Sequence, residues 1–161
     1  MVGPLDLLVA QLAQQLLQKQ QRLAVAESCT GGWLAKQCTD LPGSSAWFEC
    51  GFVTYSNQSK VSMLGVSQDT LVNFGAVSEP VVAEMAAGVL QRSAAQWAIS
   101  ISGVAGPGGG SPDKPVGTVC FGWANKDGAA QTTTVLFYGG RKIIRKQSVV
   151  YILKKILEET L

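Results

Sequence analysis

The sequence Leu23-Ala24-Val25-Ala26-Glu27-Ser28-Cys29-Thr30-Gly31-Gly32-Trp33 joins a short apolar run to small polar residues, two glycines and a helical pattern. We interpret it as a strand from Leu23 to Ala26, a turn containing Ser28, and a helix from about Gly32 to Cys38. Such a turn presents N–H groups and a hydroxyl at a helix N-terminus, which favours an anion or an oxygen that develops negative charge. The alternative is a plain helix cap, with Ser28 or Thr30 as the N-cap residue.

The rest of the chain continues this alternation of strands and helices. A first helix with leucines at three- and four-residue spacing is expected to end near Gln20-Gln21. Further strands are predicted over 46–55, 96–104, 116–124 and 129–138, and helices over 56–64, 67–74, from Ser78 onward, and over 141–159. We summarise the order as α-β-α-β-α-α-β-β-β-α, which indicates an α/β layered domain with a mixed sheet.

Composition limits the class of protein. The chain has 161 residues, of which 47% are hydrophobic and 15% charged, so we expect one globular domain over residues 1–161. A net charge of +2 is too small to argue for a nucleic-acid or membrane partner, and no aromatic-basic ladder is present. The start has no basic signal-peptide region, and the four cysteines have no CxxC spacing. These features predict a cytoplasmic protein with reduced thiols.

Histidine is absent from the sequence. This excludes a Ser-His-Asp or Cys-His catalytic arrangement and any histidine-ligated metal, and no metal or cofactor is expected. A nucleophilic serine would need Lys, Tyr, Asp or Glu as its base.

A second polar cluster, Tyr55-Ser56-Asn57-Gln58-Ser59-Lys60, follows the aromatic strand over 46–55. Sites in open α/β sheets gather beyond the carboxyl ends of strands, so Ser28 and Tyr55 are expected at one edge. A neutral Lys60 would take the serine proton directly or through the Tyr55 hydroxyl. This requires burial or a neighbouring cation to lower the lysine pKa from about 10.4 to about 7–8. Alternatively, Lys60 is a solvated helix residue and Tyr55 a strand aromatic.

Two further segments favour an anionic ligand. The loop from Gly103 to Pro115 contains Gly106, Gly108 and Gly109, whose backbone N–H groups can approach a phosphate closely, although it fits neither a Walker loop nor a dinucleotide fingerprint. The alternative is that this segment is only a flexible crossover loop.

The second of these segments begins the last predicted helix with Arg141, Lys142, Arg145 and Lys146. Cations there oppose the helix macrodipole and repel one another, and a bound phosphate would reverse both effects. The alternative to phosphate binding is that water solvates the four charges.

These motifs resemble the CinA C-terminal domain family. The matching stretches are Ala26 to Gly32, Pro42-Gly43-Ser44-Ser45, Tyr55-Ser56-Asn57, Gly75 to Glu79, Gly103 to Gly109, Lys114 to Val119 and Gly140-Arg141, so the similarity covers almost the whole chain. It implies a three-layer α/β/α sandwich with about five strands. It also implies hydrolysis of nicotinamide mononucleotide to nicotinate mononucleotide and ammonia, in pyridine nucleotide recycling. Family members are often dimeric, so a homodimer is an expectation. Two departures are Gly140, where many relatives have an acidic residue, and Cys50, where a glycine or basic residue is expected.

The resemblance implies a metal-independent mechanism with a serine, a lysine and a tyrosine, which map onto Ser28, Lys60 and Tyr55. The expected substrate-binding residues are Thr30, Gly31 and Gly32 at the oxyanion, with Asn57, Gly106, Gly108, Gly109, Arg141 and Arg145. Two alternatives stay open: Cys29 as the nucleophile, and a nucleotide-binding module that senses its ligand without catalysis.

Overall fold

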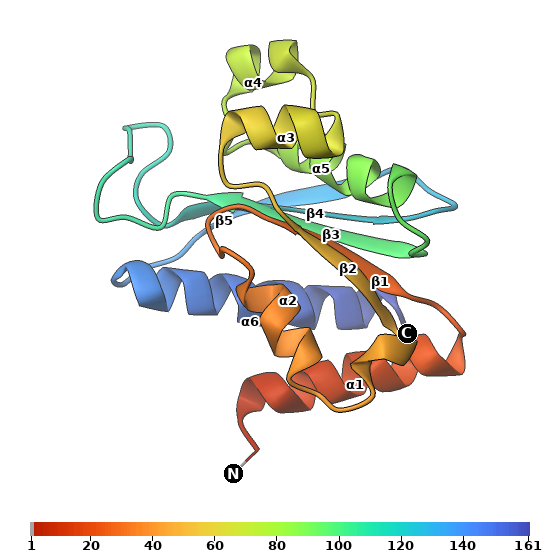
Figure 1. The fold of residues 1–161 in the computed structure, drawn as a ribbon. Helices are drawn as coiled ribbons and strands as arrows, with labels where there is room; N and C mark the ends of the chain where they lie inside the picture. Colours follow the sequence, from red (N-terminus) through yellow and green to blue (C-terminus); the bar gives the residue numbers. More distant parts are fainter. Residues whose placement is uncertain (1) are drawn as a thin grey trace.

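A computed structural model describes residues 2–161; Met1, the first residue of the expected single domain, lies outside the described residues. The described residues form five strands and six α-helices (Figure 1). The elements are α1 (Pro4–Gln18), β1 (Leu23–Glu27), α2 (Trp33–Thr39), a short 3₁₀ helix (Ser44–Ala46), β2 (Phe48–Val53), α3 (Asn57–Leu64), α4 (Gln68–Phe74), α5 (Glu79–Gln91), β3 (Trp97–Gly103), β4 (Thr118–Asn125), β5 (Gln131–Leu136) and α6 (Arg141–Glu159).

The strands form one mixed sheet in the order β2-β1-β3-β4-β5. Strand β1 runs parallel to both β2 and β3, whereas β3 pairs antiparallel with β4, and β4 with β5. All five residues of β1 are buried. The strand that leads to Ser28 therefore lies inside the molecule, which explains its unbroken apolar run.

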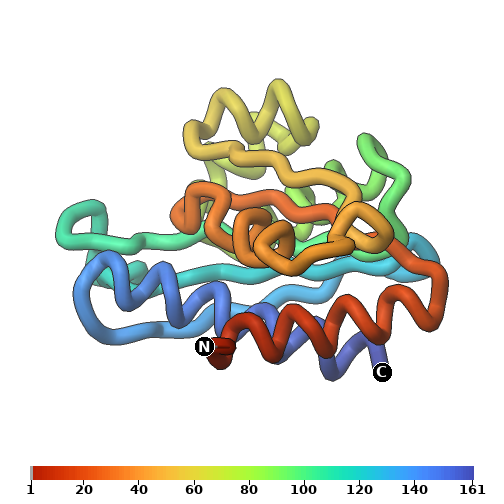
Figure 2. Tube along the Cα trace, turned by 60° about the horizontal axis from the view of Figure 1, so that its bottom comes forward, coloured from red at the N-terminus to blue at the C-terminus, as the bar shows by residue number. Residues whose placement is uncertain are grey.

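Helices cover both faces of the sheet. In Figure 1, α3, α4 and α5 lie on one face and α1, α2 and α6 on the other, and Figure 2 shows α1 and α6 running side by side beneath the sheet. Each face has its own apolar core: one is built around Leu12, Phe121 and Ile152, the other around Met85 and Val89. The three-layer α/β/α fold with a mixed five-stranded sheet is thereby confirmed.

Close packing of α3 on α5 holds the helix that carries Lys60. A Cβ atom added at Gly88 of α5 would lie only 2.1 Å from the carbonyl oxygen of Leu64, at the end of α3. No side chain fits between the two backbones there. Glycine at this position therefore allows α3 to pack this closely on α5.

The predicted order is short by one helix, because α3, α4 and α5 all lie between β2 and β3. Each of the three lies within the range predicted for it, and only the summary order omits one. The first helix ends two or three residues earlier than expected, at Gln18, because Gln20 adopts a positive φ of 54°. No helix within residues 2–161 is both long and apolar enough to cross a membrane.

Candidate active site

Ser28 and Tyr55 lie just beyond the carboxyl ends of two adjacent parallel strands. Ser28 follows β1 directly, and Thr54-Tyr55 follows β2. Glu27 pairs with Val53 in the sheet, and the Thr54 N–H donates to the Glu27 carbonyl at 2.9 Å, which extends the pairing by one residue. The parallel register therefore brings the two predicted segments together at one edge.

Lys60 points from α3 into this edge and lies beside Ser28. Its Nζ is 3.1 Å from the Ser28 hydroxyl oxygen and also donates to the carbonyl oxygens of Thr54, at 3.0 Å, and Tyr55, at 3.2 Å. The Lys60 side chain is buried, with only 1% of the residue exposed. The alternative of a solvated Lys60 is therefore wrong.

The surroundings of Lys60 favour its neutral form. Burial lowers the pKa of Lys60 below its ordinary value, and within residues 2–161 no carboxylate forms an ion pair with it. A neutral amine at hydrogen-bonding distance from a hydroxyl can accept the hydroxyl proton. Desolvation in the folded protein thus shifts the pKa of Lys60 in the direction that a lysine base requires.

Cys29 is a poor nucleophile in this setting. Only 6% of the residue is exposed, and burial raises the pKa of its thiol to about 11. The thiolate, which is the reactive form, is therefore scarce at neutral pH.

The turn between β1 and α2 is held by Glu27, which sequence analysis did not single out. The fully buried Glu27 carboxylate accepts hydrogen bonds from the N–H groups of Leu34, at 2.9 Å, and Ala35, at 3.0 Å. The N-cap residue of α2 is Gly32, and no side chain caps the helix from that position. The plain-cap alternative with Ser28 or Thr30 at the N-cap is wrong, because a carboxylate from the preceding strand occupies the helix N-terminus.

The backbone of the same turn leaves two N–H groups next to Ser28 without a backbone acceptor. The Gly31 N–H donates to the Ser28 carbonyl at 3.0 Å, and that of Trp33 to Thr30 at 3.1 Å. In the part of the chain that the structure describes, the N–H groups of Cys29 and Thr30 form no backbone hydrogen bond. The Gly32 N–H, farther along the turn, likewise forms no backbone hydrogen bond among residues 2–161, so these three are the donors of this turn that remain available to an oxyanion.

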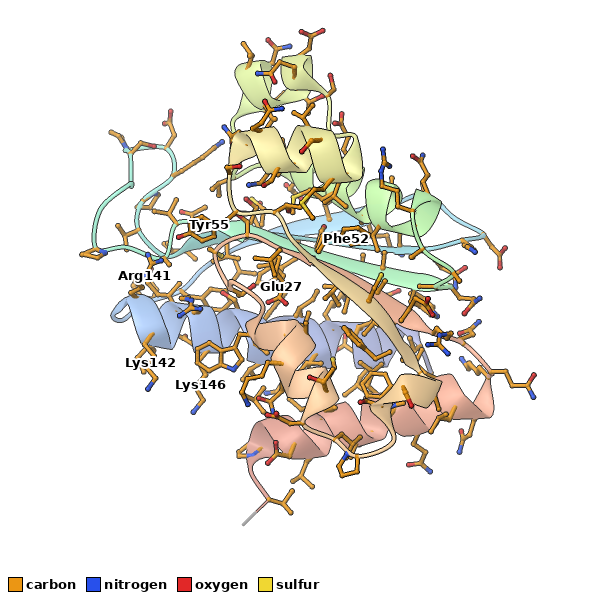
Figure 3. The ribbon with its side chains drawn as sticks, viewed as in Figure 1. Glu27, Phe52, Tyr55, Arg141, Lys142 and Lys146 are labelled. Atoms are coloured by element: carbon orange, nitrogen blue, oxygen red, sulfur yellow. The ribbon has the colours of Figure 1, made fainter. Side chains whose placement is uncertain are left out.

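Arg141 joins Tyr55 to the glycine-rich loop. Its Nη2 donates to the Tyr55 hydroxyl at 3.0 Å and its Nη1 to the Gly106 carbonyl at 2.9 Å. Figure 3 shows Arg141, at the start of α6, extending toward Tyr55. Within the described chain the Tyr55 hydroxyl makes no hydrogen bond to Ser28 or Lys60, whereas the Tyr55 backbone carbonyl contacts both.

A cavity of about 210 Å³ opens above the Ser28–Lys60 pair. Five predicted site residues line it: Ser28, Tyr55, Asn57, Lys60 and Arg141. The remaining wall comes from Cys29, Ala76, Val77, Ser102, Gly103 and Ala105. Cys29 was considered only as an alternative nucleophile, and the other wall residues were not assigned to the site, although the motifs Gly75 to Glu79 and Gly103 to Gly109 contain all of them but Ser102.

The other predicted residues lie outside this cavity. Arg145 donates through Nε to the Cys29 carbonyl and through Nη2 to the Thr30 carbonyl, both at 2.9 Å. Together with Gly31 and Gly32, Arg145 lines a separate groove. Thr30, Gly106, Gly108 and Gly109 line neither space. Among residues 2–161 no group of three Cys, Asp or Glu side chains is placed to hold a metal ion.

Comparisons with known proteins identify the family of this chain. The family described as "CinA C-terminal domain" matches residues 6–160. "Nicotinamide-nucleotide amidohydrolase PncC" of Escherichia coli (strain K12) is 52% identical over 94% of this chain and 92% of its own length. The protein of the same name from Enterobacter agglomerans is 58% identical over 83% of this chain and 82% of its own length.

Solved structures give the same result. The competence/damage inducible protein CihA from Agrobacterium tumefaciens is 40% identical, with a TM-score of 0.93 over 97% of this chain and 95% of that one. A competence or damage-inducible protein from Enterobacter asburiae is 36% identical, with a TM-score of 0.94 over 99% of both chains. With a family match across nearly its whole length and relatives this similar, the chain belongs to the CinA C-terminal domain family.

Proposed function

We propose that this protein is a nicotinamide-nucleotide amidohydrolase, which converts nicotinamide mononucleotide and water to nicotinate mononucleotide and ammonia. The observation that carries the proposal is the buried Ser28–Lys60 pair, whose reacting atoms are 3.1 Å apart. The names of relatives that are 52% and 58% identical support the same substrate. Among residues 2–161 no carboxylate lines the cavity and the Arg141 guanidinium does, which suits a phosphorylated ligand.

In the first step, Lys60 removes the proton of Ser28 as the serine oxygen attacks the carboxamide carbon. The direct distance makes a relay unnecessary, so we assign the Tyr55 hydroxyl to positioning rather than to proton transfer. The carbonyls of Thr54 and Tyr55 orient the Lys60 amine toward Ser28. General-base catalysis of this kind contributes about 10²–10⁴ in rate.

The oxyanion of the tetrahedral intermediate is stabilised by N–H groups of the turn after Ser28. Those of Cys29, Thr30 and Gly32 are available, whereas that of Gly31 is used within the turn. One such donor is typically worth about 10²–10³ in rate. The protonated Lys60 then gives its proton to the departing nitrogen, and ammonia leaves. Water hydrolyses the acyl-enzyme, with Lys60 again accepting a proton.

Arg141 and Asn57 complete the substrate site. Both line the cavity, and the Arg141 guanidinium is the group best suited to the 5′-phosphate. In this arrangement the phosphate would replace the Tyr55 hydroxyl and the Gly106 carbonyl as acceptors for Arg141.

The decisive experiment measures ammonia and nicotinate mononucleotide released from nicotinamide mononucleotide, with chelator present. Wild type should turn over and Ser28→Ala should not. Ser59→Ala, a serine of α3 outside the cavity, is the matched control and should retain activity. Binding of the nucleotide without turnover by the wild type would instead favour a sensing module.

We also expect the protein to be a cytoplasmic homodimer. Light scattering of the purified protein would measure its oligomeric state.

A further inference from the structure

A second, larger concave site lies beyond the turn that carries Ser28. This groove, of about 630 Å³, runs between the start of α1, α2 and the first turns of α6, and the Gly31–Gly32 backbone forms part of its wall. Four cationic side chains line it: Lys36, Lys142, Arg145 and Lys146. In Figure 3, Lys142 and Lys146 extend from α6 away from Arg141 and Tyr55. The basic cluster of α6 is thereby divided between two sites, and only Arg141 belongs to the catalytic cavity.

The charge of this groove is poorly compensated. No carboxylate lines it among residues 2–161, and of its four cations only Lys36 forms an ion pair, with Asp40 on the same helix. Lys142 and Lys146 are exposed and four residues apart, at the N-terminal end of a 19-residue helix. Like charges at this spacing repel, and the helix macrodipole is unfavourable to cations at this end. A bound anion would relieve both effects.

The spacing of the cations selects for more than one phosphate. Four residues of helix separate the Lys142 and Lys146 backbones by about 6 Å, and Lys36 approaches from another helix. Two adjacent phosphates offer more acceptor oxygens, spread over a greater length, to ammonium groups that approach from two helices than a single phosphate does.

Trp33 adds an aromatic wall to the same groove. The Arg145 guanidinium lies over its ring, 5.5 Å from the centroid, and both residues line the groove. Arg145 already donates hydrogen bonds to the carbonyls of Cys29 and Thr30. It therefore contributes positive charge and a flat surface to the groove rather than a pair of free N–H donors. Indole and guanidinium faces are surfaces on which nucleobases stack.

We propose that this groove binds a nucleotide that carries two or more adjacent phosphates, independently of the catalytic cavity. The phosphates lie at Lys142, Lys146 and Lys36, and the base lies against Trp33 and Arg145. The volume is within the range of small-molecule sites, which favours a nucleotide over a protein segment. Because Arg145 holds the backbone directly after Ser28, the bound nucleotide sits next to the turn that carries the nucleophile.

The test is calorimetric titration of the full chain with ADP at low salt. The double variant Lys142→Ala/Lys146→Ala should weaken ADP binding by about tenfold or more, and it should keep amidase activity. The matched control is Lys126→Ala/Lys154→Ala, which removes two exposed lysines outside the groove and should bind ADP as the wild type does. Thermal unfolding of each variant verifies that it folds.

Three results would overturn the proposal. The first is no detectable ADP binding by the wild type. The second is binding that Arg141→Ala abolishes but the Lys142/Lys146 double variant preserves, which would place ADP in the catalytic cavity. The third is pyrophosphate, which has the same number of phosphates, binding as tightly as ADP, which would leave no role for the base. Because ADP binding is read without turnover, these outcomes are independent of whether the amidase proposal holds.

Discussion

The Nζ of Lys60 and the Oγ of Ser28 lie 3.1 Å apart at a site where Lys60 is almost completely buried and has no carboxylate partner among residues 2–161. Most lysines in proteins are solvated and charged, and a charged Lys60 could not take a proton. Burial lowers the pKa of Lys60, so that one side chain satisfies the requirement for a base in a protein that has no histidine.

Activity should therefore follow the titration of Lys60. Below the lowered pKa of Lys60, kcat/KM should rise about tenfold per pH unit, and it should level off above that pKa, below the range of an ordinary lysine. A pH–rate profile of the wild type measures this. Lys60→Arg, which cannot lose its proton, should lose about 10²–10⁴ in kcat at every pH. A profile flat from pH 5 to pH 9 would contradict Lys60 as the base.

The same residue should make folding stability pH-dependent. The pKa of Lys60 is lower in the folded than in the unfolded chain, so between the two values the unfolded state binds more protons and stability rises with pH. Lys60→Met lacks this dependence. In urea unfolding, the free energy of unfolding of the wild type should increase relative to that of Lys60→Met as pH rises through that window up to about 10.4. A constant difference between the two proteins would show that Lys60 titrates normally.

Cys29 should be dispensable for catalysis. With its pKa raised to about 11 by burial, the thiol stays protonated at neutral pH. Cys29→Ala should keep turnover and lose about 1 kcal/mol of stability from the small buried volume removed. Assay of kcat beside a melting curve separates the two effects. Abolished turnover in a folded Cys29→Ala would return Cys29 to consideration as nucleophile.

Glu27 should support both the fold and the position of Ser28. Glu27→Gln replaces one acceptor oxygen by an NH₂ group facing the N–H of Leu34 or Ala35, and it removes the charge at the start of α2. We expect a loss of about 1–3 kcal/mol in urea unfolding, with lower kcat. The control, Glu79→Gln, changes an exposed carboxylate in the first turn of α5 and should stay within about 0.5 kcal/mol. Equal effects of the two changes would remove the special role of Glu27.

Arg141 should discriminate substrates by their phosphate. Arg141→Ala should lower kcat/KM for nicotinamide mononucleotide by about 10- to 100-fold, which is the value of a charge-assisted hydrogen bond. It should leave kcat/KM for nicotinamide riboside, which lacks the phosphate, unchanged. Steady-state kinetics with both substrates measure this, and Lys142→Ala, outside the cavity, is the control. An equal loss for the riboside would mean that Arg141 acts by holding Tyr55.

The order of elements and the positions of Ser28 and Tyr55 at strand ends could be predicted from the chain itself. Apolar runs, turn residues and three- and four-residue spacings are local signals, and each depends on neighbours in sequence. The absence of histidine is likewise a property of the sequence alone, and it restricts the base to a few residue types.

The division of the basic cluster and the state of Lys60 required the tertiary structure. Arg141 and Arg145 are four residues apart, yet one contacts Tyr55 and Gly106 while the other holds the carbonyls of Cys29 and Thr30. Sequence spacing places both near one face of a helix, but which acceptors each guanidinium meets depends on segments far away in the chain. The pKa of Lys60 depends on the burial created when α3 packs on the sheet and α5, and desolvation is a property of that packing, not of the local sequence.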